Sequence, residues 1–131
     1  MPWSVYVVRF SDGRDVPMDR AAVEKVLNQH SVEGTMESGA VDLLLESQCH
    51  NHVFVDLTDD EQSIAAISFQ RPSGDEIWNV IHQILQATGA VLIAPEGEIV
   101  VSSPDALVGL PDPFDEYPYT VAGSRAEMPW G

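Results

Sequence analysis

Positive charge is what this sequence has least of. Its 131 residues include six Lys and Arg against 21 Asp and Glu, which gives a formal net charge of −15 at pH 7. Such a field repels nucleic-acid phosphates and anionic membranes, so binding to either is not expected. The same field accelerates encounters with cationic proteins by electrostatic steering. The charge therefore indicates either a basic protein partner or no more than a need for solubility.

Cysteine is also scarce, since Cys49 stands alone. A single cysteine excludes an intramolecular disulfide and gives no sign of an oxidising compartment. No segment approaches the roughly 18 consecutive apolar residues of a membrane span. The N-terminus lacks a basic region followed by an apolar stretch of the signal-peptide type. We therefore expect a cytoplasmic protein that is neither exported nor anchored to a membrane.

The sequence lacks the motifs that carry common catalytic chemistry. It contains no Walker-type phosphate loop, dinucleotide fingerprint, Gly-x-Ser-x-Gly elbow or His-Glu-x-x-His motif. Four of its arginines, at positions 9, 14, 20 and 71, are scattered along the chain. We expect them to neutralise neighbouring acids instead of holding an anionic substrate. We accordingly predict no enzyme activity, no cofactor and no metal.

A hydrophobic core is nevertheless expected, because 44% of the residues are hydrophobic and the chain is long enough for one domain. Periodicity predicts the order strand, helix, three strands, helix, two strands. The predicted strands are 4–10, 40–46, 52–57, 63–70, 90–94 and 98–102. The first predicted helix is 19–30, with Asp19 as its N-cap, and the second begins after Pro72 and ends at Gly89.

Strands outnumber helices, and hairpins are the economical connection between most of them. This favours an α+β fold in which a mostly antiparallel sheet has two helices packed on one face, in a single domain over residues 1–110. Residues 4–10 are apolar on both sides, as in a strand buried inside a sheet. Residues 40–46 and 52–57 alternate apolar with polar, which predicts one buried face and one solvated face.

The composition changes over residues 111–131, where three prolines fall among acidic and aromatic residues before position 119. Such a segment cannot form a regular helix or a central strand. It is either docked on the domain or extended as a recognition segment. Docking is favoured, because Phe114, Tyr117, Tyr119 and Trp130 are costly to leave in water.

The best candidate for chemistry is the run Cys-His-Asn-His at 49–52, because thiolate and imidazole are zinc ligands. The rest of a ligand set is missing, since the other two histidines lie on predicted helices. A nucleophilic cysteine needs a lowered thiol pKa, which nearby carboxylates oppose. A small enzyme or metal-binding protein centred on Cys49, His50 and His52 is the alternative to a binding module. A self-associating adaptor, which would form a homodimer, is a further one.

The small size, the acidity, the lack of an export signal and the α+β layout together resemble those of bacterial immunity proteins. These proteins block the active site of a toxin by forming a stoichiometric complex. The resemblance implies a non-catalytic inhibitor whose partner is a basic toxin domain or enzyme. Carboxylates of such an inhibitor can occupy the Lys and Arg that hold an anionic substrate.

Candidate partner-binding residues lie in three acidic regions: a turn after the third predicted strand, a hairpin near position 97, and the C-terminal segment. Aromatic side chains of the last region can serve as buried anchors beside charge. The predicted contact residues are Asp56, Asp59, Asp60, Glu61, Glu96, Glu98, Asp112, Phe114, Asp115, Glu116, Tyr117 and Tyr119.

Overall fold

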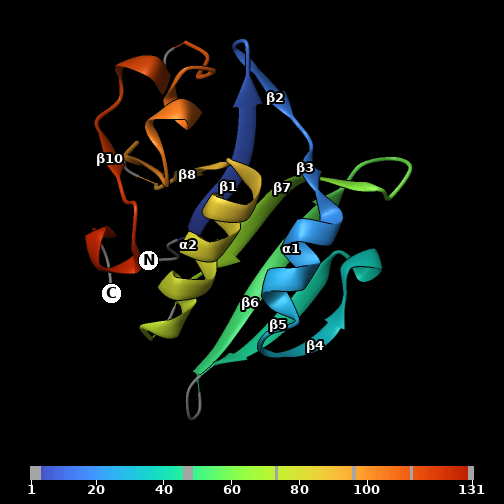
Figure 1. Cartoon of the computed structure of the whole chain (residues 1–131). Coiled ribbons are helices and arrows are strands. Elements are labelled where there is room, and N and C mark those ends of the chain that lie inside the picture. Colours follow the sequence, from blue (N-terminus) through green and yellow to red (C-terminus); the bar gives the residue numbers. More distant parts are fainter. Residues whose placement is uncertain (1–3, 46–48, 73, 96, 113, 130–131) are drawn as a thin grey trace.

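A computed structural model of the chain describes residues 4–45, 49–72, 74–95, 97–112 and 114–129. Over these residues ten strands form one sheet, accompanied by the helices α1 (Arg20–Leu27) and α2 (Glu76–Thr88) (Figure 1). The strands are β1 (Ser4–Ser11), β2 (Arg14–Val16), β3 (Met18–Asp19), β4 (Ser31–Thr35), β5 (Ala40–Leu45), β6 (Cys49–Leu57), β7 (Ser63–Gln70), β8 (Val91–Ile93), β9 (Ile99–Val101) and β10 (Tyr119–Val121). The predicted α+β fold is confirmed.

The sheet is almost entirely antiparallel, as predicted. Its strands follow the order β10-β9-β8-β1-β7-β6-β5-β4, with β2 paired to β1 and β3 paired to β7 outside this path. The β9–β10 pair is parallel, and the other pairs are antiparallel. β5, β6 and β7 form the predicted meander, and β1 lies at the centre of the sheet between β7 and β8.

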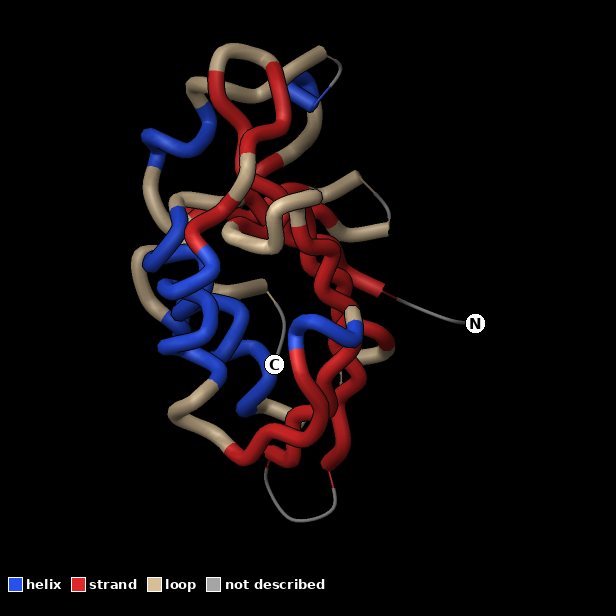
Figure 2. Tube along the Cα trace, turned by 90° about the vertical axis from the view of Figure 1, so that its right-hand side faces the viewer, coloured by secondary structure: helices blue, strands red, loops and turns tan. Residues whose placement is uncertain are grey.

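Both α-helices lie on one face of the sheet, which the side view of Figure 2 makes plain. The buried residues of α2 recur at the three- and four-residue spacing that gives a helix one apolar stripe. They pack with the inward residues of the central strands into the main core. Asp19 is the N-cap of α1, and its side chain accepts a hydrogen bond from the Ala21 amide. Gly89 is the C-cap of α2, at φ +73°. Both predicted caps are therefore present.

The opposite face of the sheet is covered over one half only, by the segment that follows β9. This segment contains the 3-10 helices η2 (Pro104–Leu107) and η3 (Phe114–Glu116). Leu92 and Val100 belong to the main core with the helices. Their neighbours in β8 and β9 point the other way and form a second apolar cluster with the segment. Its fully buried residues are Val91, Ile99 and Val101. Partly buried residues from the strands and from the segment pack against them, namely Phe10, Ile93, Ala106, Leu107, Leu110, Phe114, Tyr117 and Val121.

After β10 the chain returns to the helical face. Ala122 and Met128 are buried in the main core, and η4 (Arg125–Glu127) packs near α2. His82 on α2 is 3% exposed, and its Nε2 donates a hydrogen bond to the Ala122 carbonyl at 2.8 Å. The C-terminal segment therefore passes around the β10 edge and contacts both faces of the sheet.

The structure differs from the sequence prediction in a few elements. β2, β3, β4 and β10 were not predicted, β6 begins at Cys49, and the first helix ends at Leu27 instead of position 30. β1 is central, but the prediction that it is buried on both faces is wrong at Tyr6, whose side chain is 46% exposed. Tyr6 is exposed because the C-terminal segment stops short of that part of the outer face.

Candidate protein-binding surface

The acidic turn between β6 and β7 is held in shape by one of its own carboxylates. Asp60 Oδ1 accepts hydrogen bonds from Thr58 Oγ1 at 2.7 Å and from the Gln62 amide at 3.0 Å. These bonds lower the pKa of Asp60, the one to the backbone amide having the larger effect. Asp59 and Glu61 are exposed beside it. Of the predicted contact residues here, Asp60 therefore shapes the turn, and Asp59 and Glu61 present charge.

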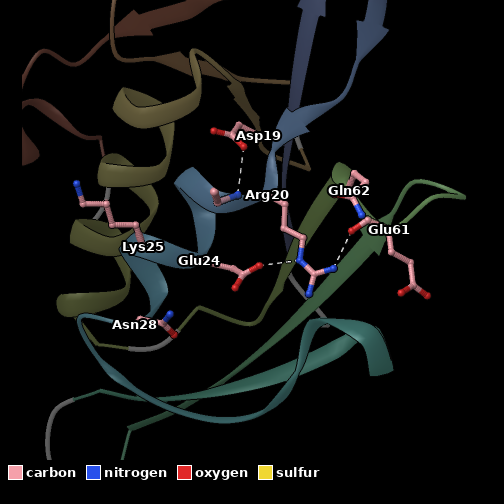
Figure 3. A pocket seen from close by; sticks show the side chains of 8 residues that line it. Asp19, Arg20, Glu24, Lys25, Asn28, Glu61 and Gln62 are labelled. Atoms are coloured by element: carbon pink, nitrogen blue, oxygen red, sulfur yellow. Dashed lines mark hydrogen bonds and ion pairs between the residues drawn. The ribbon is translucent and has the colours of Figure 1, made fainter.

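Arg20, at the start of α1, ties this turn to the rest of the domain. Its Nη1 donates to the Glu61 carbonyl at 2.7 Å and its Nε donates to Glu24 at 2.6 Å (Figure 3). Its Nη2 pairs with Glu37. Hydrogen bonds to Glu37 first, and then to Glu24, raise the pKa of Arg20. The hydrogen bond from Arg20 is in turn the main cause that lowers the pKa of Glu37. A shallow groove of about 620 Å³ opens beside it. Because carboxylates already occupy this guanidinium, Arg20 is not available to an anionic ligand in the groove.

The predicted aromatic anchors of the C-terminal segment are mostly used inside the protein. Phe114 packs with Phe10 at 5.8 Å between ring centroids and edge-on with Tyr117 at 5.3 Å. Both Phe114 and Tyr117 are half-buried in the second apolar cluster. Tyr119 on the edge strand β10 is 60% exposed. Of these three aromatic residues, only Tyr119 presents most of its side chain to a partner.

The structure brings two of the three predicted acidic regions together. The Ile99 amide bonds to the Pro118 carbonyl at 3.0 Å, and Gly97 lies against the Tyr117 ring, so the β8–β9 hairpin and the segment 114–118 are neighbours. Here Glu98 is half-buried, whereas Asp112 and Glu116 are exposed. Glu96 and the side chain of Asp115 lie outside the described residues. The turn of Asp59 and Glu61 belongs to the β6–β7 hairpin, on the other side of β1 in the strand order.

The outer face of the sheet has an uncovered half, which we call the open face. It is formed by outward residues of β1, β4, β5, β6 and β7. The two large apolar side chains of this face that are classed as exposed are Tyr6 and Phe54, at 46% and 50%. Ser68 of β7 pairs with both of them, so the three residues form one row across three strands. A shallow groove of about 280 Å³ lies between the two rings, over Ser68 and Ala66.

The Asp and Glu residues that β4, β5 and β6 place on the open face are not balanced by Arg or Lys of the same strands. β4, β5, β6 and β7 contain no Arg or Lys. Their acidic residues Glu33, Asp42 and Asp56 alternate with the inward residues and therefore share the outer side. Asp56 is exposed and lines the aromatic groove. The open face thus combines two exposed aromatic rings with carboxylates, which is the combination expected of a surface that anchors a basic protein.

Asp56 is the predicted contact residue that the structure places on this face, and Tyr6 and Phe54 are residues that the sequence prediction missed. The signal for them lies in the alternation of their strands. Tyr6 is flanked by the buried Val5 and Val7, and Phe54 by the buried Val53 and Val55. Inward valines on both sides place the aromatic residue between them on the outer face.

The alternative site around residues 49–52 is only partly described. His50 and His52 occupy alternate positions of β6 and so share the open face, where His52 Nδ1 pairs with Asp42. The side chain of Cys49 lies outside the described residues. Within the described part of the chain, no three His, Cys, Asp or Glu side chains are grouped in a way that could hold a metal ion.

Comparisons with other proteins identify no relative. No protein-family model, curated protein or solved structure matches the chain significantly. None of the helices formed by the described residues has the length and apolar character needed to cross a membrane. The function must therefore be inferred from the surface itself.

Proposed function

We propose that this chain is a non-catalytic, acidic protein-binding module that inhibits a basic protein by stoichiometric binding, in the manner of a bacterial immunity protein that neutralises a cognate toxin. The observation that carries the proposal is the open face, where Tyr6 and Phe54 are exposed among carboxylates. Aromatic side chains are the residues most often found as binding hot spots. The single cysteine fits a cytoplasmic site of action.

Charge determines the kind of partner that this face favours. The net charge of −15 and the exposed carboxylates Glu33 and Asp56 attract a cationic surface and disfavour nucleic acids and anionic membranes. Pairing of this face with a second copy would bring like charges together and cost free energy. A basic protein partner is therefore preferred over self-association. A toxin that holds an anionic substrate with Lys and Arg offers such a surface.

The test begins with affinity capture from the native host, with this chain as bait, at low and at high salt. The expected product is one basic protein in equimolar amount, held more weakly as salt rises. The captured protein is then purified, and its activity is measured with and without an equimolar amount of this chain. Inhibition supports the proposal. Capture without inhibition, or binding that is indifferent to salt, contradicts it.

A matched pair of variants locates the contact. Tyr6→Thr with Phe54→Thr removes both rings but keeps the high strand propensity of β-branched residues. Val108→Thr removes exposed apolar surface outside the sheet, where Val108 is 87% exposed. We expect the double variant to weaken binding about 30-fold or more and the Val108 variant to leave it unchanged. Equal effects of the two changes would exclude the open face as the contact.

A further inference from the structure

The row Tyr6, Ser68, Phe54 forms a slot between two aromatic walls. Neighbouring strands lie about 4.8 Å apart, so the two aromatic residues, one on each side of β7, are rooted roughly 9.5 Å apart. The small Ser68 side chain leaves the space between the rings open. Gln70 Nε2 donates to Ser68 Oγ at 2.7 Å, and Ser4 Oγ donates to Gln70 Oε1 at 3.1 Å. These bonds fix the polar residues along one side of the slot.

The dimensions of the slot suit a cation. A positive group placed midway between the two outer strands of the row lies about 5 Å from the root of each aromatic residue. That spacing is within the roughly 6 Å over which cations interact with aromatic faces. Asp56 lies two residues along β6 from Phe54, faces the same side and lines the same groove. Its exposed carboxylate is placed to pair with the cation held between the rings. β4 to β7 supply no Arg or Lys of their own to compete.

We infer that this slot binds an arginine side chain of the basic partner, stacked between Tyr6 and Phe54 and paired with Asp56. The inference rests on the proposed function and names the residue type that the open face recognises. The planar guanidinium stacks on aromatic rings and pairs with carboxylate through two parallel bonds. The ammonium of lysine is compact and strongly hydrated, so it gains less from the same walls.

The test uses small probes that need no knowledge of the partner. Nα-acetyl-arginine amide and Nα-acetyl-lysine amide are titrated in parallel into the isotopically labelled protein at low salt and followed by NMR. The arginine probe is expected to shift the signals of Tyr6, Phe54, Ser68 and Asp56 saturably, with a dissociation constant on the order of 10 mM. The lysine probe is expected to bind at least about threefold more weakly.

Variants separate the slot from the general negative charge. The Tyr6→Thr, Phe54→Thr double variant is expected to lose the saturable shifts, and Asp56→Asn to weaken the arginine probe about threefold. Asp105→Asn, which removes the same charge from the exposed start of η2, is the control and is expected to change nothing. Shifts that are equal for both probes and gather at Asp59 and Glu61, or no shifts at all, overturn the inference.

The outcomes also separate this inference from the proposed function. If a basic partner is inhibited but binds equally well after loss of Tyr6 and Phe54, the proposed function is supported. The same result refutes the inference that the slot binds an arginine of the partner. Arginine binding in the slot without any captured partner supports the slot and refutes the proposed function. An aromatic or aliphatic partner residue in the groove, seen as loss of partner binding without any arginine preference, also refutes the slot.

Discussion

Gly109→Ala is the change that tests most directly how the C-terminal segment is fixed to the sheet. A Cβ at position 109 would lie 2.9 Å from the Phe10 carbonyl oxygen and 2.9 Å from Ser11 Cα. Both atoms belong to the backbone of β1, which is paired with β2 at Phe10 and Ser11. The Gly109 carbonyl also accepts a hydrogen bond from the Gly13 amide at 3.0 Å. Position 109 requires glycine because its backbone lies close to β1, and the pairing of β1 with β2 holds that strand in place.

The magnitude follows from overpacking against a fixed backbone. One extra methyl group in such a site costs about 1–3 kcal/mol, because the segment or the strand must shift. For a chain of this length that corresponds to a fall in the thermal midpoint of about 4–12 °C. The hydrogen bond from Gly13 should lengthen at the same time, since the segment is displaced from β1 at that point.

Gly123→Ala is the matched control, because it adds the same methyl group elsewhere in the C-terminal segment. There the nearest atom to the new Cβ would be Glu127 Oε1 at 3.5 Å, an ordinary contact, and the backbone is outside the left-handed region. We expect this control to be neutral or stabilising by up to about 1 kcal/mol. Thermal denaturation of both variants and hydrogen exchange of the Gly13 amide give the answer. Equal midpoints and unchanged protection of Gly13 would refute the reasoning.

Two further predictions concern polar contacts that join separate elements. His82→Leu should lower the free energy of unfolding by about 1–3 kcal/mol, measured by urea denaturation, because the buried Ala122 carbonyl loses its donor; an unchanged value contradicts this. Pairing with Arg20 holds the pKa of Glu37 in the folded protein below its ordinary value of 4.5. The contribution of this pair to the free energy of unfolding is therefore complete above pH 4.5 and is lost as the pH falls through the folded-state pKa of Glu37. The difference in urea midpoint between the wild type and Glu37→Gln should therefore shrink below pH 4.5, and a difference that stays constant contradicts the assignment.

The elements that could be predicted from the sequence are those whose pattern is local. The apolar stripe and the terminal Gly89 define α2, and alternation defines β5 and β7. The predicted continuation of α1 to position 30 failed because the Gln29 and His30 amides form tighter three-residue turns beyond the helix. Apolar spacing does not distinguish such turns from a further helical turn.

The strands that were missed depend on tertiary pairing. β4 contains Gly34 at φ +91° and has little alternation, and β10 has three residues. Each forms one edge of the sheet, where pairing with a single neighbour provides the structure. Neither strand has a sequence pattern strong enough to be recognised alone.

The candidate surface was predictable only in part, for a related reason. The acidic residues are visible in the sequence, and Asp56 was among the predicted contacts. The exposure of Tyr6 and Phe54 depends on which half of the outer face the C-terminal segment covers. That is decided by contacts such as Gly109 on β1, which join residues about 100 positions apart in the sequence. The same strand pattern would be buried if the segment extended two strands further.

The chemistry of the outer face matches the division that the segment makes. Under the segment the face is aliphatic, with Val91, Ile99 and Val101 each fully buried. Beyond it the outward residues of β7 are small or polar, as suits a solvated surface. Single exposed apolar residues are common on proteins, and either ring alone would need no explanation. Two exposed rings in one row on either side of Ser68, beside the carboxylate of Asp56, form a surface that solvation alone does not account for.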